Sequence, residues 1–96
     1  MKTFKSALEF EWDKGNIEKN RKHDVGDKES EEAFLDENKV IFKDLLHSGV
    51  EERFILIGKT KKKRVLYAVF TMRKSRVRII SCRDINKSER SLYDKD

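Results

Sequence analysis

The residues of this chain that could do chemistry are cationic and hydroxyl side chains. Arginines stand at the ends of apolar runs between Glu51 and Arg83, where a buried sheet does not need them. Arginine binds phosphate through a planar fork of N–H donors, and histidine can exchange a proton near neutral pH. Taken singly, each of these side chains is more simply explained as a solvated surface group. Together they form one set of candidates: Lys22, His23, Arg53, Lys59, Thr71, Arg73, Arg78, Arg83, Glu89 and Tyr93.

Composition favours a polyanionic partner. The 96 residues carry 23 Lys and Arg against 18 Asp and Glu, a net charge of +5, so nucleic acid is a natural ligand. Two histidines and one cysteine show no metal-ligand spacing, and no glycine-rich phosphate loop is present. Cys82 lies inside an apolar run and is expected to be buried, and a lone cysteine fits a reducing cytoplasm. The longest apolar run, VLYAVF, is too short to span a membrane, and no secretory signal precedes it.

Three β-type runs must position the arginines. They read EERFILIGKT, VLYAVFTMR and RVRIISCRD, and short polar or basic connections separate them, which predicts an antiparallel meander. The middle run, Val65 to Met72, is apolar on both faces and is typical of a central strand that is covered on two sides. The densest basic stretch, KTKKKR, falls in the first connection and is expected to be a solvated loop that attracts phosphates.

Alternation along these strands predicts which side chains share a face. A three-residue turn at 74–76 would pair Arg73 with Val77, Thr71 with Ile79 and Tyr67 with Arg83. A connection at 60–64 would pair Lys59 with Val65 and place Arg53 opposite Thr71. Arg53, Thr71 and Arg73 would then lie on one face at one end of the sheet, with Phe54, Phe70 and Ile80 on the other.

The remaining segments predict an α+β fold. Leu8, Phe10 and Trp12 alternate with acidic residues as a first strand, and Asp13 can cap a polar helix over 14–23. A second helix begins at Asp27 or Ser30 and runs through SEEAFLDE, and Val40 to Leu46 forms a further strand. A last helix begins at Asn86, with Glu89 as its capping-box partner. The predicted order is β-α-α-β-β-β-β-α, a mainly antiparallel sheet in one domain over 1–96, with residues 1–7 as a flexible start.

Several of these segments resemble the BrnT family of toxins from type II toxin–antitoxin pairs. The similarity begins with FEWDKGNIEKNRKHDV and continues, in order, through SEEAF, EERFILIGK, VFTMR, RIISCR and ERSLY. It covers nearly the whole chain from Phe10 onward. The chain departs from the family pattern at three places: Asp24 stands where glycine is frequent, GDKES is longer than the usual segment, and Cys82 replaces a residue that is usually alanine.

The resemblance implies a small RelE-like fold and a bacterial, cytoplasmic endoribonuclease that cleaves RNA without a metal or other cofactor and inhibits translation and growth. It also implies a partner, an antitoxin with a ribbon-helix-helix DNA-binding domain, through which alone the complex would bind operator DNA. For attack of a ribose 2′-OH on phosphate, His23 is the candidate acid or base, and Arg53, Arg73 and Arg83 would bind the phosphate and its transition state. The expected substrate-binding residues are Lys22, Lys59, Thr71, Arg78 and Tyr93.

Two other interpretations remain open. The same basic face could bind RNA or DNA without cleaving it, or its arginines could meet only an acidic or aromatic segment of an antitoxin. Incubation of the purified protein with RNA and a chelator distinguishes a ribonuclease from these two alternatives, because only the ribonuclease would cleave the RNA. Co-purification with the product of a neighbouring reading frame tests the interaction role.

Overall fold

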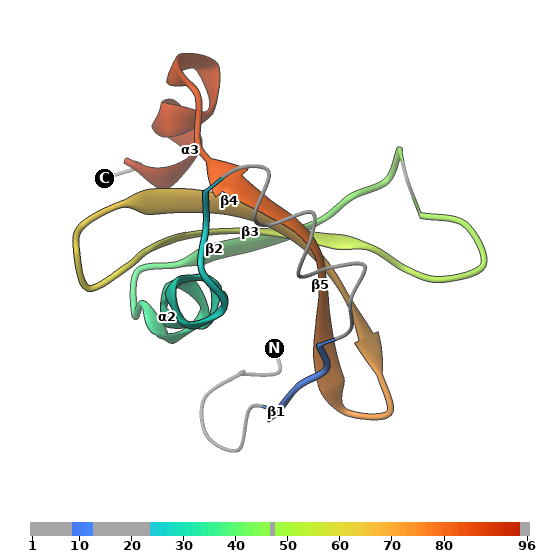
Figure 1. The fold of residues 1–96 in the computed structure, drawn as a ribbon. Helices are drawn as coiled ribbons and strands as arrows, with labels where there is room; N and C mark the ends of the chain where they lie inside the picture. Colours follow the sequence, from blue (N-terminus) through green and yellow to red (C-terminus); the bar gives the residue numbers. More distant parts are fainter. Residues whose placement is uncertain (1–8, 13–23, 47, 95–96) are drawn as a thin grey trace.

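The computed structural model describes residues 9–12, 24–46 and 48–94. These residues form a five-stranded sheet with the strand order β1-β5-β4-β3-β2 (Figure 1). β1 pairs parallel with β5 and the other three pairings are antiparallel, so the sheet is mixed but mainly antiparallel, as predicted. The strands are β1 (Glu9–Phe10), β2 (Val40–Lys43), β3 (Phe54–Lys59), β4 (Val65–Arg73) and β5 (Arg76–Asp84).

Helices lie on both faces of this sheet. α2 (Asp27–Leu35) packs on one face, and the 3-10 turn η1 (Lys87–Glu89) with α3 (Arg90–Tyr93) lies at the other (Figure 1). The predicted capping box at the start of η1 is confirmed, because the side chains of Asn86 and Glu89 each accept the other's backbone N–H. The predicted helix over 14–23 lies outside the described residues. Within the described ranges, no helix is both long and apolar enough to cross a membrane.

The larger core lies between α2 and the sheet. Phe34 of α2 meets Phe70 of β4 and Phe10 of β1 edge to face, with ring centroids 5.1 and 5.3 Å apart. Gly58 of β3 permits this packing, because a Cβ there would collide with the carbonyl oxygen of Ala33. A smaller apolar cluster of Ile55, Ile57 and Val65, with Tyr93 packed against it, covers the opposite face. β4 is therefore central and covered on both faces, as its composition predicts.

The hairpin between β4 and β5 differs from the predicted one. Its turn has two residues, Lys74 and Ser75, with φ of 48° and 72°, so Arg73 pairs with Arg76 rather than with Val77. The predicted pairing of Thr71 with Ile79 is also wrong, because Thr71 pairs with Arg78. A register shift between Val69 and Phe70 leaves Ile80 as an extra residue, and this bulge offsets the shorter turn.

Beyond the bulge, the predicted register returns. Tyr67 pairs with Arg83, and Lys59 pairs with Val65 across the 60–64 connection, both as predicted. The β3–β4 ladder runs to Phe54 opposite Phe70, which places Arg53, one residue before β3, across from Thr71. β2 ends at Lys43, three residues earlier than predicted, because the backbone turns at Leu45 and Leu46.

Candidate functional site

The predicted site residues lie at two ends of the same sheet. Tyr67 and Arg73 are both on β4, six positions apart, which is roughly 20 Å at about 3.3 Å per residue. Alternation from Tyr67 to Arg73 puts both ends on the face opposite α2. We call Arg53, Thr71, Arg73 and Arg78 the hairpin-end cluster, and Lys59, Tyr67, Arg83, Glu89 and Tyr93 the carboxyl-terminal cluster. Lys22 and His23, the remaining candidates, lie outside the described residues.

Arg73 of the hairpin-end cluster is held by exposed carboxylates. Its Nε donates to Glu51 at 2.9 Å, and a terminal nitrogen lies 3.8 Å from Glu11. The Arg73 side chain is 46% exposed and that of Glu51 is 43% exposed, so water screens the pair strongly. These side chains line a hollow of about 940 Å³ together with Glu9, Lys74 and Arg76. These exposed carboxylates hold Arg73 only weakly, because exposed ion pairs contribute about 1 kcal/mol or less.

Thr71 organises the segment beside Arg73. It is 1% exposed, and its hydroxyl donates to the backbone carbonyl of Glu52 at 2.7 Å. The backbone N–H of the neighbouring Arg53 donates to the Ser48 hydroxyl at 3.0 Å, and the backbone carbonyl of Arg53 accepts from the Asp44 N–H at 2.8 Å. The Thr71 bond holds Glu52 against β4, and the other two bonds hold Arg53 against Asp44 and Ser48, so Thr71 positions the segment that carries Glu51 and Arg53. Its hydroxyl already has a partner and is buried from a substrate.

Arg83 of the carboxyl-terminal cluster is bound more completely. Its two terminal nitrogens donate to the two oxygens of Glu89 at 2.9 and 2.7 Å, and the guanidinium lies 4.2 Å from the centroid of the Tyr67 ring. The Glu89 side chain is only 14% exposed. The Arg83 guanidinium holds the pKa of Glu89 below its usual range against the opposing effect of burial, and Glu89 in turn raises the pKa of Arg83. This pair joins the end of β5 to η1.

Tyr93 is hydrogen-bonded to Asp36, the residue directly after α2. Its hydroxyl donates to Asp36 at 2.6 Å, and the same carboxylate oxygen accepts the Lys59 N–H at 2.8 Å. Burial opposes ionisation of Asp36, but hydrogen bonds from Tyr93 and from two backbone N–H groups outweigh it and lower the pKa. Burial, with the hydrogen bond to Asp36, raises the pKa of Tyr93 to about 12. Tyr93 is therefore a phenol at neutral pH and is no proton acceptor there.

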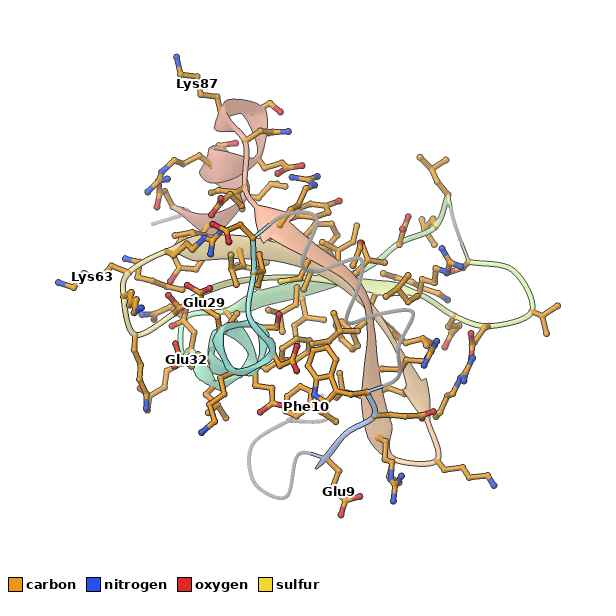
Figure 2. The ribbon with its side chains drawn as sticks, in the orientation of Figure 1. Glu9, Phe10, Glu29, Glu32, Lys63 and Lys87 are labelled. Atoms are coloured by element: carbon orange, nitrogen blue, oxygen red, sulfur yellow. The ribbon has the colours of Figure 1, made fainter. Side chains whose placement is uncertain are left out.

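A charged network on the α2 face was not predicted from the sequence. Arg64 donates to Glu29, to Asp84 and to the backbone carbonyl of Asp24, the residue that follows His23 in the chain. The hydrogen bond from Arg64 lowers the pKa of Asp84 despite partial burial. Only the length of the KTKKKR run hinted that one of its cations has a structural role. Lys63 and Lys87 extend into solvent at this end, whereas Glu9 marks the hairpin end (Figure 2).

Cys82 is buried, as predicted. It is fully inaccessible, and desolvation raises the pKa of its thiol to about 11. Since the thiolate is the reactive form, this cysteine is unsuited to nucleophilic chemistry at neutral pH.

Two further residues contact the predicted site residues but were not predicted themselves. They are Tyr67, which lies against Arg83, and Asp36, which binds Tyr93. The predicted pairing of Tyr67 with Arg83 was the available signal for the first of them.

Comparisons with known proteins assign the family. A search of curated proteins finds no match to this chain. A family model described as the ribonuclease toxin BrnT of type II toxin–antitoxin systems matches residues 12–89, which include every described residue of the hairpin-end cluster. The match also spans Lys59, Tyr67, Arg83 and Glu89 of the carboxyl-terminal cluster and stops before Tyr93. The chain belongs to the BrnT family of ribonuclease toxins of type II toxin–antitoxin systems.

Proposed function

We propose that this chain is a metal-independent endoribonuclease that cleaves RNA by attack of a ribose 2′-OH on the adjacent phosphate, and so inhibits translation and growth in the bacterial cytoplasm. The observation that carries the proposal is the family match over residues 12–89, which contains the arginine-rich hairpin-end cluster. A RelE-like fold and neutralisation by an antitoxin with a ribbon-helix-helix domain belong to the same proposal.

Arg73 is the main phosphate ligand in this mechanism. Its ion pair with Glu51 is exposed, so the guanidinium can exchange a carboxylate for a phosphate with little loss. Arg53 lies across from Thr71, and Arg78 is paired with Thr71 on β5, so both guanidinium groups project from the same face as Arg73. Charge that develops on the phosphorane would be stabilised by these donors, an effect that is typically worth about 10²–10³ in rate for one contact.

His23 is assigned to proton transfer, with Lys22 beside it. This role requires the segment before Asp24 to reach the phosphate at Arg73 when RNA is bound, because the Asp24 carbonyl accepts from Arg64 at the other end of β4. An imidazole with a pKa near 6.5 can accept the 2′-OH proton or protonate the leaving 5′-oxygen, whereas an arginine cannot.

Tyr93 is unsuited to accept the 2′-OH proton, because its pKa is raised to about 12 and its phenol stays protonated at neutral pH. Its ring, together with Lys59 at 5.7 Å from the ring centroid, would instead provide a surface for a base and a phosphate.

Arg83 is assigned to a different task from Arg73. A separation of roughly 20 Å prevents both from touching one phosphate. The bidentate bond to Glu89 and the Tyr67 ring favour a role in positioning the carboxyl-terminal segment. Arg83 then acts on catalysis through the structure that it supports.

The test is cleavage of single-stranded RNA by the purified chain in excess EDTA. We expect cleavage to continue, and the products to carry 2′,3′-cyclic phosphate and 5′-hydroxyl ends, because the 2′-OH is the nucleophile. His23→Ala should remove most of the activity. Tight RNA binding without cleavage by the parent chain would instead identify a nucleic-acid-binding module, and absence of both would leave an interaction protein.

A further inference from the structure

Three apolar side chains project from the segment between β2 and β3. Leu45 is 76% exposed, Leu46 is 90% exposed and Val50 is as open as in an extended peptide. Only two other large apolar side chains of the described residues are exposed, Leu35 at 61% and Leu92 at 39%, and they stand apart in the sequence. Contiguous exposed apolar groups of this kind mark interaction surfaces in soluble proteins.

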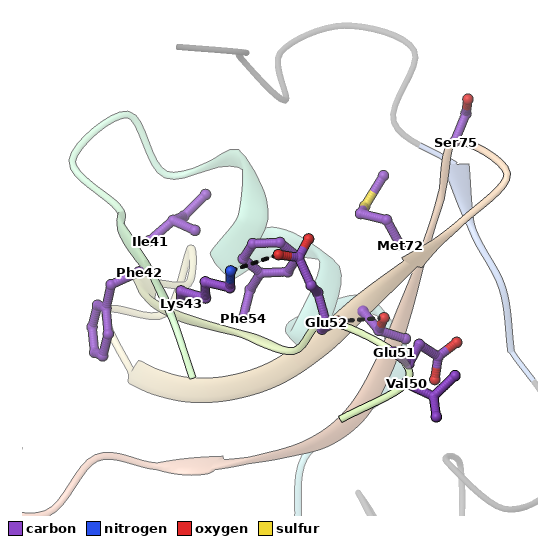
Figure 3. A pocket seen from close by; sticks show the side chains of 10 residues that line it. Ile41, Phe42, Lys43, Val50, Glu51, Glu52, Phe54, Met72 and Ser75 are labelled. Carbon is purple, nitrogen blue, oxygen red and sulfur yellow. Dashed lines mark hydrogen bonds and ion pairs between the residues drawn. The ribbon is translucent and has the colours of Figure 1, made fainter. Parts of the chain in front are cut away.

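An apolar hollow lies beside Val50, one of these three side chains. It has a volume of about 900 Å³, and Ile41, Phe54 and Met72 supply apolar walls while Val50 stands at its rim (Figure 3). An ion pair crosses the opening, with the amine of Lys43 2.6 Å from Glu52. The hollow is on the α2 face of the sheet, because Ile41, Phe54 and Met72 all pack against the core beneath α2. Its apolar walls are therefore on the other face from Arg73, while Thr71 and Glu51 border the hollow on the side toward Arg73.

The free edge of the sheet borders the same hollow. β2 is the last strand in the sheet order, so one of its sides has no neighbour among the described strands. The Asp44 N–H donates to the Arg53 carbonyl at 2.8 Å. In an antiparallel pair only alternate residues bond toward a given neighbour, so the backbone groups of Val40, Phe42 and Asp44 point toward β3. The N–H and C=O groups of Ile41 and Lys43 consequently point outward, in the arrangement that accepts an added strand.

We propose that the cognate antitoxin is anchored here by an extended apolar segment that pairs with the outer edge of β2. This inference rests on the proposed function, since a type II toxin requires a protein that neutralises it. Every second side chain of the added strand would lie on the α2 face beside Ile41 and Lys43, so apolar residues would fill the hollow and cover Val50. The partner chain beyond the pairing would pass Leu46, which is exposed in the segment that follows β2. The net charge of +5 favours an acidic partner over a second copy of the chain, because two copies would repel each other.

The anchor and the arginine cluster are neighbours on opposite faces. Glu51 lines both the apolar hollow and the hollow of Arg73, so a bound segment would end close to the proposed catalytic face. Anchoring by apolar burial and backbone hydrogen bonds depends weakly on salt, unlike docking on arginines. The part of the affinity that this anchor supplies should therefore change little between low and physiological ionic strength.

The experiment measures binding of the full chain to the purified product of the reading frame next to its gene, with RNA cleavage as a separate readout. The test variant is Leu46→Ser/Val50→Ser, which changes exposed positions and should leave the fold intact. The matched control is Leu35→Ser, an exposed leucine on α2 that is remote in sequence from this surface. We expect the test variant to bind roughly tenfold or more weakly than the parent, the control to bind like the parent, and all three to cleave RNA equally.

Each other binding outcome overturns the anchor, while the cleavage assay tests the activity separately. Parent-like affinity of the test variant, or loss of binding on Arg73→Ala instead, would place the antitoxin on the arginine face while cleavage still supports the enzyme. No binding of the neighbouring product by the parent would also reject the anchor. If light scattering showed that the parent is a dimer and the test variant a monomer, this surface would be the interface between two copies of the chain. Loss of cleavage in the parent would refute the enzyme on its own.

Discussion

The two ends of the sheet use the same pair of residue types for different purposes. At the hairpin end, Arg73 meets Glu51 through one nitrogen, and both side chains are nearly half exposed. At the carboxyl-terminal end, Arg83 binds both oxygens of Glu89, whose side chain is 14% exposed, and lies over Tyr67. The first guanidinium is the one that we propose as a phosphate ligand, and the second is a structural link. Burial of the carboxylate and bidentate geometry, rather than residue type, distinguish the two arginines.

The largest effect is expected from Arg73→Ala. Loss of the guanidinium should lower the rate of RNA cleavage by about 10²–10³, because one donor to the developing phosphorane charge is removed. Arg73→Lys should fall between the parent and Arg73→Ala, since it keeps the charge and loses the planar fork. Single-turnover cleavage and the thermal midpoint of unfolding should be measured on the same samples.

Arg76→Ala is the matched control at the same turn. Arg76 is 58% exposed and pairs with Glu9 at 3.3 Å, so its loss should change cleavage by no more than about fivefold, the equivalent of about 1 kcal/mol. Equal losses from Arg73→Ala and Arg76→Ala would mean that the whole turn contributes only diffuse charge, and the assignment of Arg73 would then be abandoned.

Alternation and local turn chemistry account for what could be predicted from the sequence. The central strand Val65–Met72, the Tyr67–Arg83 pairing and the Asn86–Glu89 capping box all depend on contacts close in sequence or on period-two patterning. The turn at Lys74 and Ser75 was mispredicted because neither residue is the asparagine or glycine that usually adopts positive φ. Period-two counting could not reveal the bulge at Ile80, and charge alone could not show which arginine binds Glu89 and which meets exposed carboxylates.

Breaking the structural link at the other end should affect stability before catalysis. Arg83→Ala removes a bidentate charge-assisted bond and leaves a mostly buried carboxylate, so the free energy of unfolding should fall by about 1–3 kcal/mol. RNA cleavage, measured below the unfolding transition, should change less than for Arg73→Ala. A double-mutant cycle with Glu89→Gln isolates the pair, and its coupling energy should be at least about 0.5 kcal/mol.

Arg90→Ala provides the comparison for this cycle. Arg90 and Asp94 form an exposed i,i+4 pair, with side chains 58% and 56% exposed, which should contribute no more than about 0.5 kcal/mol. A hundredfold loss of cleavage in folded Arg83→Ala would contradict the division of roles between the two ends and make Arg83 a catalytic group.

Acid should weaken the carboxyl-terminal end by a smaller, graded amount. The hydrogen bond from Arg83 lowers the pKa of Glu89 below its ordinary value of 4.5 in the folded chain. The contribution of this carboxylate is therefore complete above about pH 4.5 and is lost as the pH falls through the lower, folded pKa. In denaturant titrations from pH 6 to pH 3, Glu89→Gln should lose less stability than the parent. Parallel pH profiles for the two proteins would show that the pair contributes nothing to acid sensitivity.

The smallest effect is expected from freeing Arg73 rather than removing it. Glu51→Gln deletes the carboxylate that competes with phosphate for the Nε of Arg73, and an exposed pair of this kind contributes about 0.2–1 kcal/mol. Affinity for a short RNA with a 2′-deoxy block at the cleavage site should therefore rise by up to about fivefold, and more at low salt than at high salt. Glu52→Gln is the control, because its partner is Lys43 on the α2 face and its loss leaves the Arg73 pair intact. If the two variants bound RNA equally, the gain would come from net charge alone. A specific gain in Glu51→Gln would show that the exposed pair holds Arg73 ready for phosphate, which the bidentate pair at Arg83 cannot do.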